Sequence, residues 1–92
     1  MNRARLEAQL RNAFAPAPGA LRVVVRQVMD LTESGQYAKD TGSELTVSEL
    51  VEHLADAPDE QLVDRWNWWL GSLELAYGNY AVFEVRRWAD ER

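Results

Sequence analysis

Apolar residues recur at helical spacing in two segments of the first third of the chain. The first segment, from about residue 2 to 14, turns Leu6, Leu10, Ala13 and Phe14 to one side. The second, from about 19 to 34, has an apolar face made of Leu21, Val24, Val25, Val28 and Leu31. Two helices are therefore predicted, although the three consecutive valines from Val23 to Val25 would also suit a strand.

Helix-capping and helix-breaking residues support the predicted ends of these helices. Asn2 stands where it can accept a hydrogen bond from the first turn, and the prolines of "APAPG" end the first helix. Ser34-Gly35 supplies a stop for the second helix, because glycine readily adopts the left-handed conformation found at helix ends. The polar, glycine-containing stretch from 36 to 45, "QYAKDTGSEL", is predicted to be a loop.

A third helix is predicted over about 46–56. Thr46 and Glu49 have the spacing of a capping box, in which each side chain binds the other residue's backbone N–H. Leu50, Val51 and Leu54 form its buried edge, and "DAPDE" then ends it and begins the next helix.

The last predicted helix covers about 58–90 and carries two apolar seams. The first seam consists of Leu62, Trp66, Trp69, Leu73, Ala76, Tyr80 and Phe83, widened by Leu70, Tyr77 and Trp88. The second consists of Trp68, Gly71, Leu75, Gly78, Val82 and Val85. A helix with two seams needs two neighbours, and the alternative is a break at "YGNY", where Gly78 and Asn79 would make a turn.

The two glycines favour a homodimer through the second seam. A glycine inside a helix costs about 1 kcal/mol relative to alanine, which calls for a compensating close contact. A small chain with three short covering helices has little material to bury a second seam, so another copy is the expected neighbour. Trp68 opens this seam as an interface anchor, whereas Trp66, Trp69 and Trp88 are expected in the core.

Length and composition indicate one all-α domain, residues 1–92, built as a small bundle of about four helices around the long C-terminal one. Apolar residues make up 47% of the chain, and no run approaches the length of a membrane span. There is no cysteine, so disulfides and thiolate metal sites are excluded. The first residues lack the apolar run of a secretory signal, and a cytoplasmic location is expected.

Charge is divided along the chain. Residues 40–64 hold eight acidic residues and neither lysine nor arginine, which predicts an acidic partner-binding face made of Glu49, Glu52, Asp56, Asp59, Glu60 and Asp64. Residues 1–26 hold five arginines against the single acidic residue Glu7, and these could contact nucleic acid: Arg3, Arg5, Arg11, Arg22 and Arg26. Both charged regions could also simply face water or each other.

The sequence shows no pattern typical of an enzyme. His53 is the only histidine, and with Glu49 one turn before it falls short of a metal-ligand set. Ser72 lies in "LGSLE", which is not a nucleophile motif, and no phosphate-binding or calcium-binding loop is present. We therefore expect neither catalysis nor a cofactor.

These observations favour a non-enzymatic protein-binding module, a small acidic adaptor or inhibitor that recognises a basic partner surface. The net charge of −5 makes nucleic-acid binding the weaker alternative, as a DNA- or RNA-binding regulator using the N-terminal arginines. A subunit of a larger particle is a further alternative that the sequence does not separate from the first.

Overall fold

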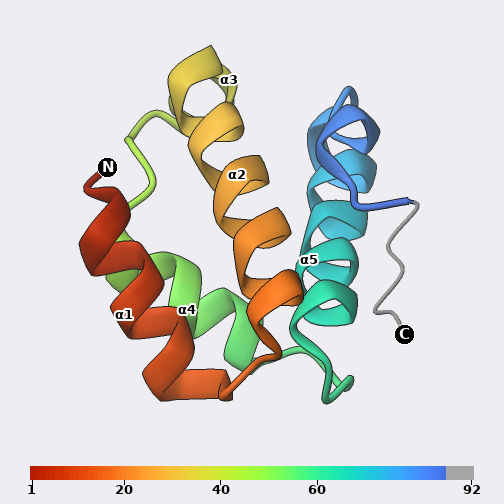
Figure 1. The fold of residues 1–92 in the computed structure, drawn as a ribbon. Helices are drawn as coiled ribbons and strands as arrows, with labels where there is room; N and C mark the ends of the chain where they lie inside the picture. Colours follow the sequence, from red (N-terminus) through yellow and green to blue (C-terminus); the bar gives the residue numbers. More distant parts are fainter. Residues whose placement is uncertain (87–92) are drawn as a thin grey trace.

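The computed structural model describes residues 1–86 and confirms the predicted all-α class. Within this range, five α-helices and one 3-10 turn follow one another: α1 (Arg3–Phe14), α2 (Pro18–Ser34), α3 (Gln36–Thr41), α4 (Val47–Ala55), α5 (Leu62–Tyr77) and η1 (Ala81–Phe83). Figure 1 shows α2 in the middle, with α1 and α4 on one side of it and α5 on the other.

Helix α2, rather than the C-terminal helix, is the central element of the bundle. It contacts α1, α3, α5 and η1, whereas α5 contacts α2, α4 and η1. The predicted role of the C-terminal helix as a spine is therefore wrong in detail, because α5 ends at Tyr77 and is no longer than α2.

The predicted helix starts follow from local hydrogen bonds that the structure contains. The Asn2 side chain accepts from the Arg5 backbone N–H, and Thr46 and Glu49 form the complete capping box of α4. Gly35 ends α2 with a φ of 75°, as the Ser34-Gly35 stop predicts. The three valines that could have formed a strand lie inside α2, where Val24 and Val25 are buried and Val23 packs partly buried against the core.

The loop predicted over 36–45 is wrong for its first part, which forms α3. This short helix stands between Gly35 and Gly42, which both have positive φ and allow the chain to change direction on either side of it. Its polar composition suits a half-exposed helix, and Tyr37 is the residue that packs against the core.

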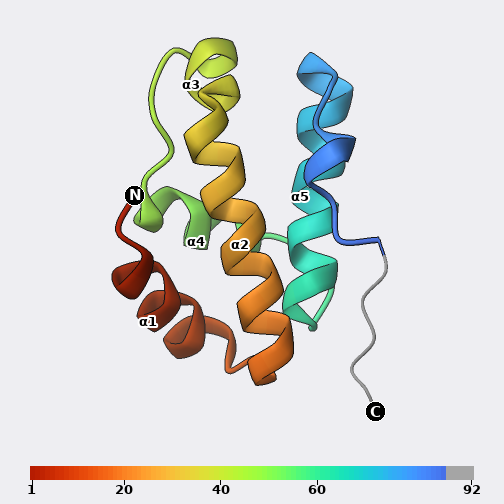
Figure 2. The ribbon, with the colours of Figure 1, turned by 45° about the horizontal axis from the view of Figure 1, so that its top comes forward.

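The single helix predicted over 58–90 is also wrong, because the chain turns at Gly78. Gly78 and Asn79 both have positive φ, and residues 78–86 run back along α5 in both ribbon views (Figures 1 and 2). The Glu74 carboxylate accepts hydrogen bonds from the backbone N–H groups of Asn79, Tyr80 and Ala81, at 3.2, 2.7 and 2.9 Å. These bonds stabilise the turn that replaces the helix.

The core lies between α2 and its neighbours, and it includes two aromatic side chains that are fully buried, Trp66 and Tyr80. Trp69 is buried as well, and the predicted core position of Trp88 lies outside the described residues. No helix within residues 1–86 has the length and apolar character that crossing a membrane requires.

Candidate functional site

The four residues from 66 to 69 have different environments although they are consecutive on α5. Trp66 points into the core, and its indole Nε1 donates to the Phe83 carbonyl oxygen at 2.9 Å. Trp69 is buried one turn later, and its ring stacks on His53 with centroids 5.0 Å apart and planes 15° apart. Both tryptophans therefore serve the packing of the domain.

Asn67 holds the returning segment through one residue's main chain. Its Nδ2 donates to the Val85 carbonyl oxygen and its Oδ1 accepts from the Val85 N–H, both at 2.9 Å. This pairing reproduces what a neighbouring β-strand offers, and it leaves the side chain of Asn67 fully committed to the fold. No spacing in the sequence indicates it.

Trp68 is the member of the four whose side chain the fold leaves outside the core, with 41% of its surface exposed. Asp64, Trp68, Gly71 and Leu75 are spaced by four, three and four residues, which places them on one face of α5. Leu75 is 91% exposed, and a Cβ added at Gly71 would meet no atom within 4 Å. We call these four residues the Trp68 face.

Exposed large apolar side chains are concentrated at this end of the chain. Of the five such residues in the described range, four come from α5 or the turn after it, namely Trp68, Leu75, Tyr77 and Val82. Of these, Trp68 and Leu75 share the Trp68 face, and exposed apolar side chains that lie together are typical of an interaction surface.

The structure does not assemble the predicted self-association seam. Because α5 ends before Gly78, only Trp68, Gly71 and Leu75 share a helical face, and Val82 lies on η1. Val85 is buried against the same molecule and is unavailable to a second copy. Gly78 is explained by its backbone conformation rather than by a close helix crossing.

The predicted acidic face is spread over three neighbouring parts of the chain. Glu49, Glu52 and Asp56 are exposed at α4 and its C-terminal end, Asp59 and Glu60 lie in the connection to α5, and Asp64 is in the first turn of α5. Glu49 is partly occupied by its capping box. Asp64 is the residue that joins the acidic series to the Trp68 face.

The arginines of the nucleic-acid alternative are all exposed on α1 and α2. Arg11 and Arg22 line a shared hollow of about 430 Å³ between the two helices, and Glu7 lines it too. A carboxylate in the hollow weakens its attraction for a phosphate. The structure brings these two arginines together and does not gather all five into one patch.

Arg65 has a structural role that sequence reasoning missed. Its Nη1 donates to the carbonyl oxygens of Leu54 and Ala57, at 2.9 and 3.3 Å, near the C-terminal end of α4. Its guanidinium carbon lies 4.9 Å from the centre of the Phe14 ring. A cation placed on the free carbonyls of a helix end is favourable, so Arg65 ties α5 to α4 and α1.

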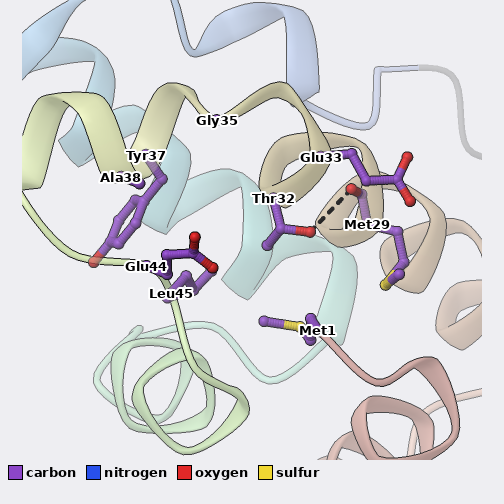
Figure 3. Close-up of a pocket in the computed structure, with 9 residues that line it drawn as sticks. All are labelled: Met1, Met29, Thr32, Glu33, Gly35, Tyr37, Ala38, Glu44 and Leu45. Atoms are coloured by element: carbon purple, nitrogen blue, oxygen red, sulfur yellow. Dashed lines mark hydrogen bonds between the residues drawn. The ribbon is translucent and has the colours of Figure 1, made fainter.

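A pocket of about 180 Å³ lies beside the C-terminal end of α2, and Figure 3 shows the residues that line it. Its lining includes the side chains of Met1, Met29, Glu33 and Glu44. Tyr37 also faces it, and the pKa of Tyr37 is raised, first by burial and then by the charge of Glu49. The pocket thus has two carboxylates and apolar walls, and its nine lining residues include no histidine or lysine that could activate a hydroxyl.

Two groups with a shifted pKa, Glu74 and Tyr80, lie at the end of α5 and in the turn after it. Burial raises the pKa of Tyr80, and so does its hydroxyl hydrogen bond to Asp40 Oδ2 at 2.8 Å. The backbone N–H groups of Tyr80 and Ala81 lower the pKa of Glu74 by binding its charged form. In residues 1–86, no three histidine, aspartate or glutamate side chains converge as potential metal ligands.

Comparison with known proteins adds one finding. Residues 1–74 match a protein family described as the WNWW domain, and those four letters spell residues 66–69 of this chain. No curated protein and no solved structure matches the chain.

Proposed function

Since the chain belongs to the WNWW domain family, we propose that it is a non-enzymatic protein-binding module whose contact surface is centred on Trp68. The partner is a protein with a basic surface, and the module acts in the cytoplasm as an adaptor or inhibitor. The proposal combines two features of the described residues, an exposed aromatic face on α5 and the acidic residues that border it.

One observation carries the proposal. Of the four residues that the family's description spells, Trp66 and Trp69 are buried and Asn67 is bound to Val85, so the fold accounts for three. Trp68 remains exposed although tryptophan is costly to leave in water, and exposed tryptophans are frequent binding hot spots. A partner that covers Trp68 would give the fourth residue its function.

The acidic residues favour a basic partner over a second copy of the chain. Asp64 lies one turn before Trp68, and Glu60 is exposed in the connection just ahead of α5. Pairing two copies through this face would place like charges near each other, in a chain whose net charge is already −5. A basic partner surface has the complementary charge, and attraction between the two would speed association at low salt.

The test compares variants of two aromatic residues on α5 that are exposed to a similar extent. Trp68 is 41% exposed and Tyr77 is 47% exposed, but Tyr77 lies off the Trp68 face. A tagged wild-type chain, Trp68→Ala and Tyr77→Ala would each be used to capture proteins from extract, with quantitative mass spectrometry of the eluates. Once a captured protein has been purified, its affinity for each variant is measured directly.

We expect Trp68→Ala to weaken binding of the purified partner by roughly 30-fold or more, the size of a hot-spot loss, and Tyr77→Ala to leave it nearly unchanged. Replacing Glu60 and Asp64 by Gln and Asn should slow association and flatten its dependence on salt. Equal binding by Trp68→Ala and wild type would refute the proposed surface.

Two other outcomes would assign a different function. Capture that disappears after nuclease treatment and after Arg11→Ala and Arg22→Ala would support the nucleic-acid regulator. A doubled mass of the free chain in light scattering, returned to about 10.5 kDa by Trp68→Ala, would support a homodimer. A set of partners that stay together through purification would point to a subunit of a larger particle.

A further inference from the structure

Hydrogen bonds from α5 side chains reach the segment after α5 only at its main chain. Within the described residues, α5 side chains make six hydrogen bonds to residues 79–85, and all six end on backbone N–H or carbonyl groups. Trp66 binds the Phe83 carbonyl, Asn67 binds both main-chain groups of Val85, and Glu74 binds three N–H groups. Contacts of this kind recognise backbone shape and impose little on the sequence that is bound.

The bound segment is a 3-10 turn, Ala81–Phe83, followed by extended backbone, and its buried and exposed side chains resemble those of a docked peptide. Glu84 is extended, with φ of −71° and ψ of 149°. The side chains of Tyr80 and Val85 are buried, whereas Val82 between them is 73% exposed. Peptides that dock on a folded domain commonly use main-chain bonds for affinity and a few side-chain pockets for selectivity.

The α5 residues that bind the segment lie inside the range that matches the family, and the bound segment lies outside that range. Trp66, Asn67 and Glu74 lie within the matched residues 1–74, and the segment that they hold follows the match. Trp66 and Asn67, two of the four residues that the family's description spells, therefore bind the backbone of a segment that lies outside the match.

We propose that Trp66, Asn67 and Glu74 form a receptor site for a short peptide whose backbone makes one 3-10 turn and then extends, and that residues 79–85 occupy this site as an intramolecular ligand. The partner is a peptide with an aromatic residue, a β-branched aliphatic residue five positions later, and a free N–H at that second position. This site uses a different face of α5 from the Trp68 face and does not depend on the function proposed above.

Gly78 gives experimental control over the occupant. Its φ of 83° and ψ of 159° belong to a region that glycine alone adopts readily, and the chain can return along α5 only through this turn. A Cβ at Gly78 would meet no atom within 4 Å, so a larger residue opposes the turn without a clash. Gly78→Val therefore favours release of the segment and leaves the receptor residues unchanged.

The experiment measures binding of a fluorescein-labelled peptide, NYAVFEVR, which copies residues 79–86, to the full chain by fluorescence anisotropy. In the wild type the tethered segment competes at a high effective concentration, so the peptide binds weakly. Gly78→Val should bind it about 5- to 150-fold more tightly, the range expected from the cost of the strained turn.

Two changes test the backbone contacts at Val85. Adding Asn67→Ala to Gly78→Val should lower peptide affinity by about tenfold, because both bonds to the Val85 main chain are lost. A peptide with proline in place of Val85 lacks the N–H that Asn67 accepts and should bind equally poorly. A peptide with Glu84→Ala serves as the control and should bind like the parent.

Circular dichroism and thermal melting of each variant show whether it is folded, and Tyr80→Ala provides a second way to loosen the segment if Gly78→Val does not fold. A folded variant that binds the peptide no better than the wild type overturns the proposal, and so does binding that ignores Asn67→Ala. If neither variant folds, the segment is an indispensable part of the core and the site is not a receptor. A doubled mass of Gly78→Val in light scattering would assign the site to the same segment of a second copy.

Discussion

Replacing Trp66 and Trp68 separately by phenylalanine should change the stability of the domain very differently. The two side chains are two positions apart on α5, yet Trp66 is fully buried and Trp68 is 41% exposed. Phenylalanine keeps an aromatic ring and removes the indole N–H together with part of the ring volume. Comparing the two variants therefore separates the effect of losing core packing at Trp66 from the effect of changing an exposed ring at Trp68.

The expected loss at Trp66 has two parts. Removing the indole N–H leaves the partly buried Phe83 carbonyl without its protein partner, which costs about 1–3 kcal/mol depending on how far water can replace it. The smaller ring leaves a cavity among the core residues, and the cavity adds about 1 kcal/mol. The free energy of unfolding should fall by about 2–4 kcal/mol, which lowers the melting temperature of a domain this size by about 10–30 °C.

Trp68→Phe changes no hydrogen bond seen in the described residues and should alter the free energy of unfolding by less than about 0.5 kcal/mol, a few degrees at most. The assay is thermal and urea unfolding followed by circular dichroism at 222 nm on the wild type and both variants. The reasoning is refuted if Trp66→Phe melts within a few degrees of the wild type, or if Trp68→Phe melts as low as Trp66→Phe.

Three further predictions follow from the packing around α5. Arg65→Met should destabilise the domain by about 2 kcal/mol in urea unfolding, because it removes charge-assisted bonds to the end of α4. Arg65→Lys keeps the charge and should lose less stability. Equal stability of Arg65→Met and wild type would contradict the bridging role. Gly71→Ala should raise the free energy of unfolding by about 1 kcal/mol, since the new methyl group meets open space within a helix, and a lower melting temperature would refute this. The folded-state pKa of Tyr80 is raised, so the stability that it contributes is complete below about pH 10 and is lost as the pH rises above that value. Tyr80→Phe should flatten this alkaline fall in urea titrations, leaving the smaller contribution of Tyr37, whose pKa is raised too; an unchanged fall would show that Tyr80 is not its source.

Local signals explain why α1, α2 and α4 could be predicted. Asn2, Gly35 and the pair of Thr46 and Glu49 act on residues at most three positions away, so the sequence and the structure describe the same hydrogen bonds. The apolar faces of these helices need no knowledge of which element covers them. The capping residues in particular identify helix ends to within a residue.

The end of α5 could not be fixed in the same way because tertiary contacts imitate a helical pattern. Tyr80 and Phe83 continue the apolar spacing of the helix, yet they reach the core from a turned segment that runs back along α5. The sequence "YGNY" allowed either reading, and the Glu74 carboxylate decides it by binding three N–H groups beyond the turn. That interaction spans five to seven residues and matches no capping pattern used for prediction.

The candidate sites were predicted in part for a related reason. The exposure of Trp68 follows from its position off the apolar seam, and the structure agrees. The pairing of Asn67 with Val85 joins residues 18 positions apart, and it depends on a turn that the sequence leaves undecided. A backbone-binding side chain of this kind has no signature in spacing or charge.

The hydrogen bond between Tyr80 and Asp40 can form only late in the synthesis of the chain. These residues are 40 positions apart, so at a translation rate of about 5–20 residues per second the ribosome adds Tyr80 about 2–8 s after Asp40. Secondary structure forms far faster than that, so α1 and α2 have time to form before Tyr80 is added. During those seconds the apolar faces of α1 and α2 are open to other chains and to chaperones, and the bond between Tyr80 and Asp40 forms only after α5 has been made.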